Sequence, residues 1–429
     1  MTPTPLATAR DPFEVIAAPG GVELHLQRTD KYKSVLLLWV VEAPLDERRA
    51  ARALLPDLLT RGTARSPGLA AMAARCEELY AMDLLAEVSA HGRLQLLRFG
   101  FEAVADRYSG GRPLFMEAAE LLAEVLHEPP LPGGRLRADF LEQERTNLVH
   151  AIAAMADDKA LYSYRRLVET MHAGTPFALH PWGTVEQAAA LDEPAVRAAW
   201  DEVRDELPVR LMIVGDVSRE QALDACARLL AGTRHAPHAP AQLAPALPER
   251  PLRHVREVQP LAQSKLVMGF RVQPELLPGA AAPLFGLVFG GDSHSRLFKR
   301  VREAESLAYG CSAGVSIESA TAVVQAGVDA VNAPRTQELV LDELRRLAEH
   351  GVREDELALS RRAQLRRLDN LKDSPRAACA FRLGALMSGR PHVLEEARER
   401  VQRVTPEQVA AVAAGCEADT VFLLEGKLP

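Results

Sequence analysis

The residues best suited to chemistry are an arginine and a tyrosine set seven positions apart, Arg302 and Tyr309, in the stretch GGDSHSRLFKRVREAESLAYG. A guanidinium presents a rigid fork of N–H donors and a phenol presents one O–H donor, so both suit the binding of carbonyl oxygens. Seven residues make two helical turns, and both side chains face one surface if a helix runs that far. Gly290 and Gly291 precede the pair, and glycines let the backbone approach a substrate or partner closely. If this stretch is half of a site, the other half lies elsewhere in the chain or in a partner.

The elements that position this stretch belong to a duplicated unit. VLLLWV, from Val35, resembles KLVMGF, from Lys265, and EELYAMDLLAEVS places Tyr80 opposite Tyr309 in ESLAYGCSAGVS. RLVETMHAG resembles RLGALMSG further along the chain. Each match is short. The matches nevertheless follow the same order in both halves, and the difference in residue number between matching positions only decreases along the chain, which indicates a duplicated domain.

Each half has the same order of predicted elements: an apolar strand, two helices, a strand pair around a turn, long helices and a final apolar strand ending in glycine. The turn AHGR at 90–93 marks a hairpin. Hairpin-paired strands with helices grouped between them predict an α+β fold, each unit an antiparallel-rich sheet packed with helices. A Pro- and Ala-rich linker is expected at 233–251, between domains at 1–232 and 252–429. The apolar periodicity of 136–156 predicts one long helix.

Composition excludes several classes of function. Hydrophobic residues make up 48% of the chain and charged residues 25%, as in soluble globular proteins. The formal net charge is -7 and the sequence has no basic cluster, so it lacks the basic surface that nucleic-acid binding requires. The longest apolar run, 35–41, is too short to cross a membrane, and the N-terminal residues lack the pattern of a signal peptide, so we expect a cytoplasmic protein without a membrane segment. The five widely spaced cysteines include no CxxC pair and are expected to be reduced thiols.

Three stretches together resemble the pitrilysin/insulinase family of zinc metallopeptidases: the Arg302/Tyr309 stretch, HPWGT at 180–184, and ALLPDLLTRGT at 53–63. The resemblance covers nearly the whole chain. It implies two duplicated domains of the pitrilysin and mitochondrial-processing-peptidase type. It also implies that Arg302 and Tyr309 bind a peptide and stabilise negative charge on its carbonyl oxygen in the transition state, with Gly290 and Gly291 near the substrate.

The zinc motif of that family is degenerate in this chain. Aligned on its Arg-Gly-Thr ending, the family's His-x-x-Glu-His falls on Ala53, Pro56 and Asp57, and the later glutamate ligand falls near Ala151. Alanine has no donor atom, proline cannot take a proton, and one aspartate cannot hold zinc, which needs about three protein ligands. Neither His150 nor HVLEE at 392–396 completes another metal site, so we expect no metal in this chain.

Two functions are compatible with this pattern. The first is the Arg/Tyr subunit of a heterodimeric zinc peptidase, inactive alone, whose homologous partner carries His-x-x-Glu-His and the zinc. The second is an inactive homologue that acts as a scaffold or binding protein. APLDE and LLPDLLTRGT also resemble a bacterial branch associated with aminopentanol modification of elongation factor P. A homodimer and a monomer are the other states of assembly that the sequence leaves open.

Overall fold

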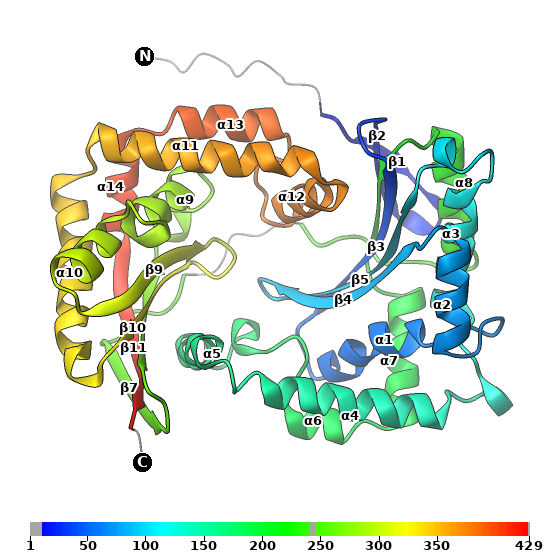
Figure 1. Ribbon diagram of the computed structural model, residues 1–429, viewed down its shortest axis with the longest axis horizontal. Helices are drawn as coiled ribbons and strands as arrows, with labels where there is room; N and C mark the ends of the chain where they lie inside the picture. Colours follow the sequence, from blue (N-terminus) through cyan, green and yellow to red (C-terminus); the bar gives the residue numbers. More distant parts are fainter. Residues whose placement is uncertain (1–10, 241–245, 428–429) are drawn as a thin grey trace.

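The computed structural model describes residues 11–240 and 246–427, whose strands form two sheets (Figure 1). The six-stranded first sheet has the order β1-β2-β6-β3-β5-β4, with β1 (Glu14–Ala17), β2 (Glu23–Arg28), β3 (Ser34–Pro44), β4 (Asp83–His91), β5 (Leu94–Val104) and β6 (Val209–Gly215). The five-stranded second sheet has the order β7-β11-β8-β10-β9, with β7 (Arg253–Gln259), β8 (Ser264–Val272), β9 (Ala308–Ser316), β10 (Thr321–Val328) and β11 (Cys416–Gly426).

The two sheets share one topology, which confirms the predicted duplicated α+β fold. Strands β2, β6, β3, β5 and β4 correspond in order to β7, β11, β8, β10 and β9, and in each sheet only the first of these pairings is parallel. The predicted hairpin is β4–β5, and the predicted final strands end at Gly215 and Gly426. The domain boundaries remain a prediction, because residues 1–10, 428–429 and part of the predicted linker, 241–245, lie outside the described residues.

The first half contains α1 (Arg49–Thr60), α2 (Leu69–Glu78), α3 (Leu114–His127), α4 (Ala138–Ala154), α5 (Lys159–Met171), α6 (Val185–Ala189), α7 (Glu193–Asp205) and α8 (Arg219–Leu229). All of these except α5 lie with the first sheet. The predicted helix at 136–156 is α4, and the apolar run at 35–41 lies in β3. β3 is buried on both faces, as its continuous apolar sequence requires, and Trp39 and Trp200 are among the largest fully buried side chains.

The second half has its own core, with which most of its helices pack. They are α9 (Ala281–Gly286), α10 (Ala333–His350), α11 (Glu354–Asn370), α12 (Pro375–Met387), α13 (Leu394–Gln402) and α14 (Pro406–Ala414). Two π-helical segments, η6 (Leu287–Gly291) and η7 (Phe298–Ala304), precede β9. Short 3-10 turns join other elements at η1 (Pro19–Gly21), η2 (Asp106–Tyr108), η3 (Pro132–Gly134), η4 (Pro176–Ala178), η5 (Pro274–Leu276), η8 (Ala330–Asn332) and η9 (Leu371–Asp373).

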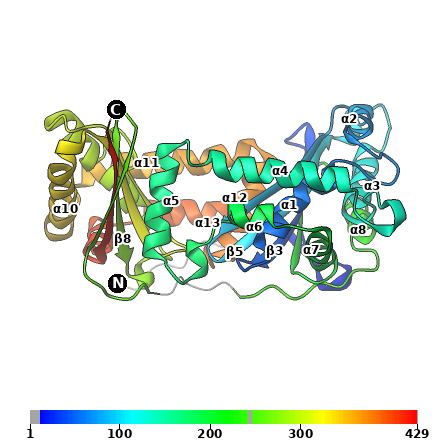
Figure 2. The same ribbon diagram turned by 90° about the horizontal axis from the view of Figure 1, so that it is seen from below.

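One helix of each half covers the sheet of the other half. Helix α5 packs on β8 and β11, and helix α12 packs on β3 and β6 (Figures 1 and 2). The first contact buries Leu167, Met171, Val267, Phe422 and Leu424 in one apolar cluster. The second buries Leu36, Leu38, Val40, Met212, Val214, Cys379 and Leu383, among others, in another. The two halves are therefore joined by a reciprocal exchange of helices as well as by the linker.

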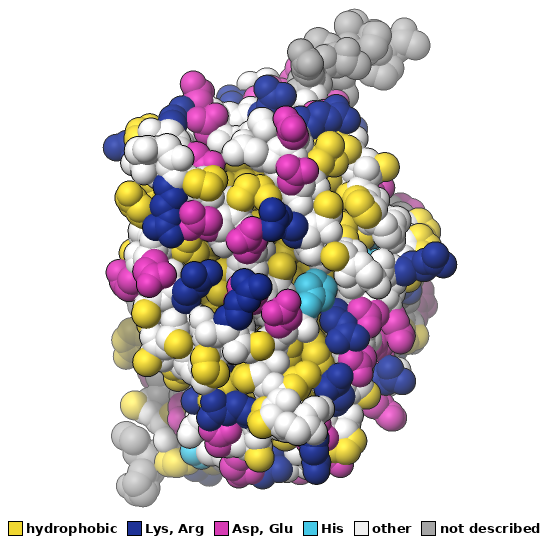
Figure 3. Space-filling view, turned by 90° about the vertical axis from the view of Figure 1, so that its right-hand side faces the viewer, with side chains coloured by type: hydrophobic (Ala, Val, Ile, Leu, Met, Phe, Trp, Pro, Cys, Tyr) yellow, Lys and Arg dark blue, Asp and Glu magenta, His cyan; other side chains and the backbone are white. Residues whose placement is uncertain are grey.

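The outer face of the first half, over α2, α3 and α8, mixes basic and acidic side chains with small apolar areas (Figure 3). This face therefore has no extended surface of a single charge. Across residues 11–240 and 246–427, no helix is long and apolar enough to cross a bilayer. All five cysteines are free thiols, as expected.

Candidate functional site

Arg302 projects from η7 because its neighbours anchor that segment. Leu297 and Val301 are fully buried in the second core, which turns Arg302 outward. Its guanidinium carbon lies 4.7 Å from the centroid of the Phe298 ring, a cation–π contact that holds the side chain in place. Within the described part of the chain no carboxylate pairs with Arg302, and Glu305 instead pairs with Arg335 at 3.6 Å. The guanidinium donors are therefore available to a ligand.

Tyr309 lies on β9, the edge strand of the second sheet, at a β-bulge. Gly310 pairs with Gly327, but the next pair joins Ala308 to Val328, so Tyr309 is the extra residue. A bulge redirects the side chain that it carries, and bulges concentrate at sheet edges and next to active sites. The Tyr309 side chain is accordingly 71% exposed, the most exposed of the aromatic side chains in the described residues.

The helix that begins before Arg302 does not run as far as Tyr309. The helical segment ends at Ala304, and the chain then passes through Ser306, whose φ of 52° lies in the left-handed region, before β9 begins. Arg302 and Tyr309 therefore flank a short turn between a helical segment and a strand. The predicted counterpart Tyr80 is also displaced, since it lies in a left-handed turn (φ 61°) before β4 and not on the strand.

The two predicted glycines of the substrate site lie where the chain packs against itself. A Cβ on Gly290 would be 2.6 Å from both the Cβ and the N of Ala313 on β9. A Cβ on Gly291 would be 2.8 Å from Leu287 Cδ2. The close backbone approach that Gly290 permits is thus to the strand that carries Tyr309. A role of either glycine at the substrate remains a prediction.

The degenerate zinc-motif positions lie on two neighbouring helices. Ala53 and Pro56 are buried in α1, whereas Asp57 on α1 and Ala151 on α4 are exposed. Although Asp57 is exposed as a residue, partial burial of its carboxyl, followed by the charge of Glu144, raises the pKa of that carboxyl. In residues 11–240 and 246–427, no group of three His, Cys, Asp or Glu side chains could hold a metal ion. The residues present do not fit zinc.

An arginine network, which the motif analysis missed, stabilises the first turns of α1. Arg52 is fully buried and donates to Gln95 Oε1 at 2.9 Å, Pro44 O at 2.7 Å and Glu202 Oε2 at 3.3 Å, and also pairs with Asp46. A buried guanidinium needs such partners for its charge and donors. In the sequence, the one sign of this network was an arginine inside an apolar helix.

The HPWGT loop belongs to the same network. Gln95 Nε2 donates to Arg49 O at 2.8 Å and to Pro181 O at 2.6 Å, so the loop is fixed to the start of α1. His180 Nδ1 accepts from the backbone N–H of Trp182 at 3.1 Å. Burial, and then the charges of nearby arginines, lower the pKa of His180 to about 3, so its ring is neutral. The loop thus supports α1 rather than supplying a charged group.

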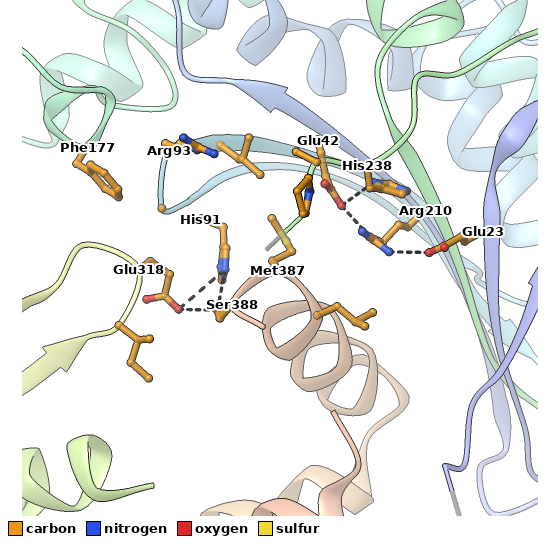
Figure 4. A pocket seen from close by; sticks show the side chains of 16 residues that line it. Glu23, Glu42, His91, Arg93, Phe177, Arg210, His238, Glu318, Met387 and Ser388 are labelled. Atoms are coloured by element: carbon orange, nitrogen blue, oxygen red, sulfur yellow. Dashed lines mark hydrogen bonds and ion pairs between the residues drawn. The ribbon is translucent and has the colours of Figure 1, made fainter. Parts of the chain in front are cut away.

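A cavity of about 500 Å³ lies between the two halves (Figure 4). At one end Glu42 accepts from Arg210 Nε at 2.8 Å and lies 3.1 Å from Nδ1 of His238, a residue of the predicted linker. Despite the opposing effect of burial, these two partners hold the pKa of Glu42 below its usual value.

The other end of this cavity is a junction of three segments. Ser388, just after α12, lies 3.2 Å from His91 Nε2 and donates to Glu318 Oε1 at 3.2 Å. The serine and histidine have the residue types of a hydrolase, but the carboxylate contacts the serine instead of orienting the far nitrogen of the imidazole. Neither Arg302 nor Tyr309 lines the cavity. It joins the halves and is separate from the predicted site.

Comparisons with known proteins agree with this degenerate architecture. Residues 205–364 match the model of a family described as "Peptidase M16 inactive domain". A Bacillus subtilis (strain 168) protein named "Probable inactive metalloprotease YmfF" is 25% identical over 417 residues, which cover 96% of this chain and 98% of that protein.

Solved structures show the same fold. A conserved protein from Enterococcus faecalis V583 superposes with a TM-score of 0.88 at 24% identity, covering 97% of this chain and 99% of that one. A peptidase M16 inactive domain from Pseudomonas fluorescens gives 0.78 at 18% identity, covering 97% and 98%.

The fold and the degenerate metal motif thus resemble those of proteins described as inactive homologues of zinc metallopeptidases. Residues 205–364 resemble the M16 peptidase inactive domain, and nearly the whole chain is similar to a probable inactive metalloprotease, in agreement with the resemblance to the pitrilysin/insulinase family. The family resemblance read from the sequence is confirmed.

Proposed function

We propose that this chain is the Arg/Tyr subunit of a cytosolic heterodimeric peptidase, whose homologous partner carries His-x-x-Glu-His and the zinc ion. The observation that carries the proposal is that two hydrogen-bond donors, the Arg302 guanidinium and the Tyr309 hydroxyl, are exposed on either side of one turn. Arg302 is stacked on Phe298 without a carboxylate partner among the described residues, and Tyr309 projects from a bulge. A purely structural arginine and tyrosine have no need of this arrangement.

In this proposal each residue has a defined task. During attack on a peptide bond, negative charge develops on the carbonyl oxygen, and a donor already aimed at that oxygen lowers the barrier. The Tyr309 hydroxyl donates one hydrogen bond to that oxygen. The Arg302 guanidinium binds the same oxygen or a neighbouring carbonyl, and Phe298 limits its rotation before the peptide arrives. The partner subunit supplies the metal chemistry that Ala53, Pro56 and Asp57 cannot.

Cleavage of an unstructured peptide tests the proposal. This chain alone, the His-x-x-Glu-His partner alone and their mixture are assayed in the presence of zinc, and only the mixture should be active. Arg302→Ala and Tyr309→Phe should each reduce kcat/KM of the mixture by about 100-fold, as expected for one lost transition-state donor. Tyr80→Phe and Arg345→Ala, which alter an exposed tyrosine and an exposed arginine elsewhere, are the matched controls. Full activity of a mixture with Tyr309→Phe contradicts the proposal.

A second function, a non-catalytic scaffold, is favoured by one observation: the matched family is described as an inactive domain. In that case the chain binds a polypeptide partner without cleavage. Association of the two chains in sedimentation velocity, with no cleavage of any peptide by the mixture, supports the scaffold over the divided site.

A further inference from the structure

A second hollow, of about 390 Å³, lies next to the Arg302/Tyr309 turn. Phe298, the ring under Arg302, lines it, and so does Gly310, the residue after Tyr309. The hollow therefore lies beside the two residues that would hold the peptide carbonyl, although neither of them lines it. No carboxylate-bearing side chain is among the residues that line it.

Two glycines on neighbouring strands help to create this hollow. Gly310 on β9 pairs with Gly327 on β10, and a Cβ on Gly310 would meet no atom within 4 Å. A Cβ on Gly327 would lie 2.6 Å from Gln263 Oε1, so the Gln263 side chain lies over that glycine. Helix α5 packs on β8 and β11 of the same sheet, whereas η6, η7 and α9 contact β9, and the hollow lies between Ala160 of α5 and Phe298 of η7. A peptide side chain thus has space beside the bulge.

Lys265 is the one charged side chain among the residues that line the hollow. Its Nζ donates to Gln263 Oε1 at 2.6 Å, and no Asp or Glu of residues 11–240 and 246–427 pairs with it. An ammonium group has three donors, so two remain for a ligand. Gln263 fixes the position of the ammonium without neutralising its charge, and the half-buried position of Lys265 reduces the screening by water.

We infer that this hollow is a subsite for a carboxylate of the bound peptide, with Lys265 as the residue that determines specificity. The inference rests on the proposed function, because it assumes that a peptide lies along Arg302 and Tyr309. The carboxylate is that of an Asp or Glu side chain within a few residues of the carbonyl held by Tyr309, or the C-terminal carboxylate of a short peptide. Both present the same anionic group to the ammonium, and a set of four peptides separates them.

The test measures direct binding of fluorescent unstructured peptides to the full chain by anisotropy. The four peptides carry Glu or Gln at one central position, each with a free or an amidated C-terminus. The preferred carboxylate should bind about fivefold more tightly than its neutral counterpart, the upper range for a partly exposed ion pair. The preference should diminish as salt rises from about 0.05 to 0.5 M.

Charge variants identify the lysine. Lys265→Gln should abolish the preference for the carboxylate, and Lys265→Glu should reverse it toward a peptide with Lys at the central position. Lys33→Gln, at an exposed lysine in the bend just before β3, is the matched control and should preserve the preference. The reversal by Lys265→Glu excludes a general folding defect, since a misfolded chain cannot gain a new preference.

The outcomes separate this inference from the proposed function. Equal binding of all four peptides, with binding still weakened by Arg302→Ala, overturns the carboxylate subsite and leaves the proposed function intact. A carboxylate preference that persists in Lys265→Gln also overturns the subsite. Absence of peptide binding, both to the chain alone and to its mixture with the His-x-x-Glu-His partner, overturns the proposed function and the inference together.

Discussion

Met171, the last residue of α5, packs so closely over Gly269 of β8 that a methyl group on the glycine would overlap its sulfur. The Leu167 Cδ2 atom, one helical turn earlier, would lie 3.1 Å from the same methyl group. Because Gly269 has no side chain, it leaves the space into which α5 packs. Since α5 belongs to the first half of the chain and β8 to the second, this contact is one of the two that hold the halves together.

Gly269→Ala tests that contact. The added methyl group must displace Met171, which is 1% exposed, and overpacking of this kind typically costs about 1–3 kcal/mol. We expect this loss in the free energy of unfolding, measured by urea titration. Gly384→Ala in α12, where an added Cβ meets nothing within 4 Å, should be neutral or stabilising because alanine favours helix. Equal stability of the two variants would show that α5 does not depend on the space at Gly269.

The other exchanged helix carries a buried charge. Arg382 of α12 is 1% exposed and donates to Asp11 Oδ2 at 2.6 Å, near the Phe13 ring. Asp11→Asn leaves the buried guanidinium without its counter-charge and should destabilise the protein by about 3 kcal/mol, whereas Arg382→Met removes that charge and should cost less. In the Arg382→Met background Asp11→Asn should be nearly neutral. A double-mutant cycle in urea checks this, and additive losses would contradict the pairing.

Buried neutral histidines should make stability depend on pH. Burial is the largest cause that lowers the pKa of His25 and His172 to about 4, from 6.5 in the unfolded chain. Above pH 6.5 both states are neutral, and the stability is fully present. Between pH 6.5 and 4 only the unfolded chain binds the protons, so stability should fall by about 1.4 kcal/mol per pH unit for each histidine. Urea titrations at pH 7.5, 6.5 and 5.5 measure the slope, which His172→Gln should reduce.

Arg302 and Tyr309 should matter for activity without contributing to stability. Both are exposed, and surface substitutions usually change the free energy of unfolding by less than about 0.5 kcal/mol. Arg52→Ala is the contrasting variant: it leaves buried partners of α1 without their donor and should cost about 3 kcal/mol or more. Thermal melts of the three variants provide the comparison. A large loss in Tyr309→Phe would assign that hydroxyl a structural role.

The altered α1 should leave this chain without a zinc site. We expect that zinc titration gives no stoichiometric binding and that a chelator leaves the unfolding midpoint unchanged, because the aligned positions offer only the Asp57 carboxylate. Calorimetry and metal analysis of the dialysed chain measure both. The variant that restores the motif, Ala53→His, Pro56→Glu, Asp57→His and Ala151→Glu, should bind zinc if the alignment is correct. Tight zinc binding by the unaltered chain would contradict the prediction that it has no zinc site.

The sequence predicted the order of the main elements in each half because apolar strands, a hairpin turn and terminal glycines are local signals, but it did not predict the first strands β1, β2 and β7. It did not predict the exchange of α5 and α12. An amphipathic helix shows which face it buries but not which sheet receives it, and the fit of Met171 to Gly269 exists only in three dimensions. The arginine network around Arg52 was missed for the same reason, since Gln95 and Glu202 are distant in sequence.

At the candidate site, the sequence identified the residue types but not their geometry. A spacing of seven residues between Arg302 and Tyr309 is compatible with one continuous helix. It is equally compatible with a helix that ends, and a strand that begins, between the two residues. The left-handed Ser306 and the bulge at Tyr309 decide between the two, and neither has a distinct residue signature in this chain. The hollow beside Lys265 depends on glycines that pair across two strands, which no local pattern reveals.

The exchange of helices also affects how the protein is made. The apolar face of β3 leaves the ribosome long before α12, the helix that covers it. During that interval the nascent first half presents an incomplete surface, which favours aggregation or capture by chaperones. A gene truncated after the linker, or split into two separately expressed halves, should consequently yield fragments that are soluble only when produced together.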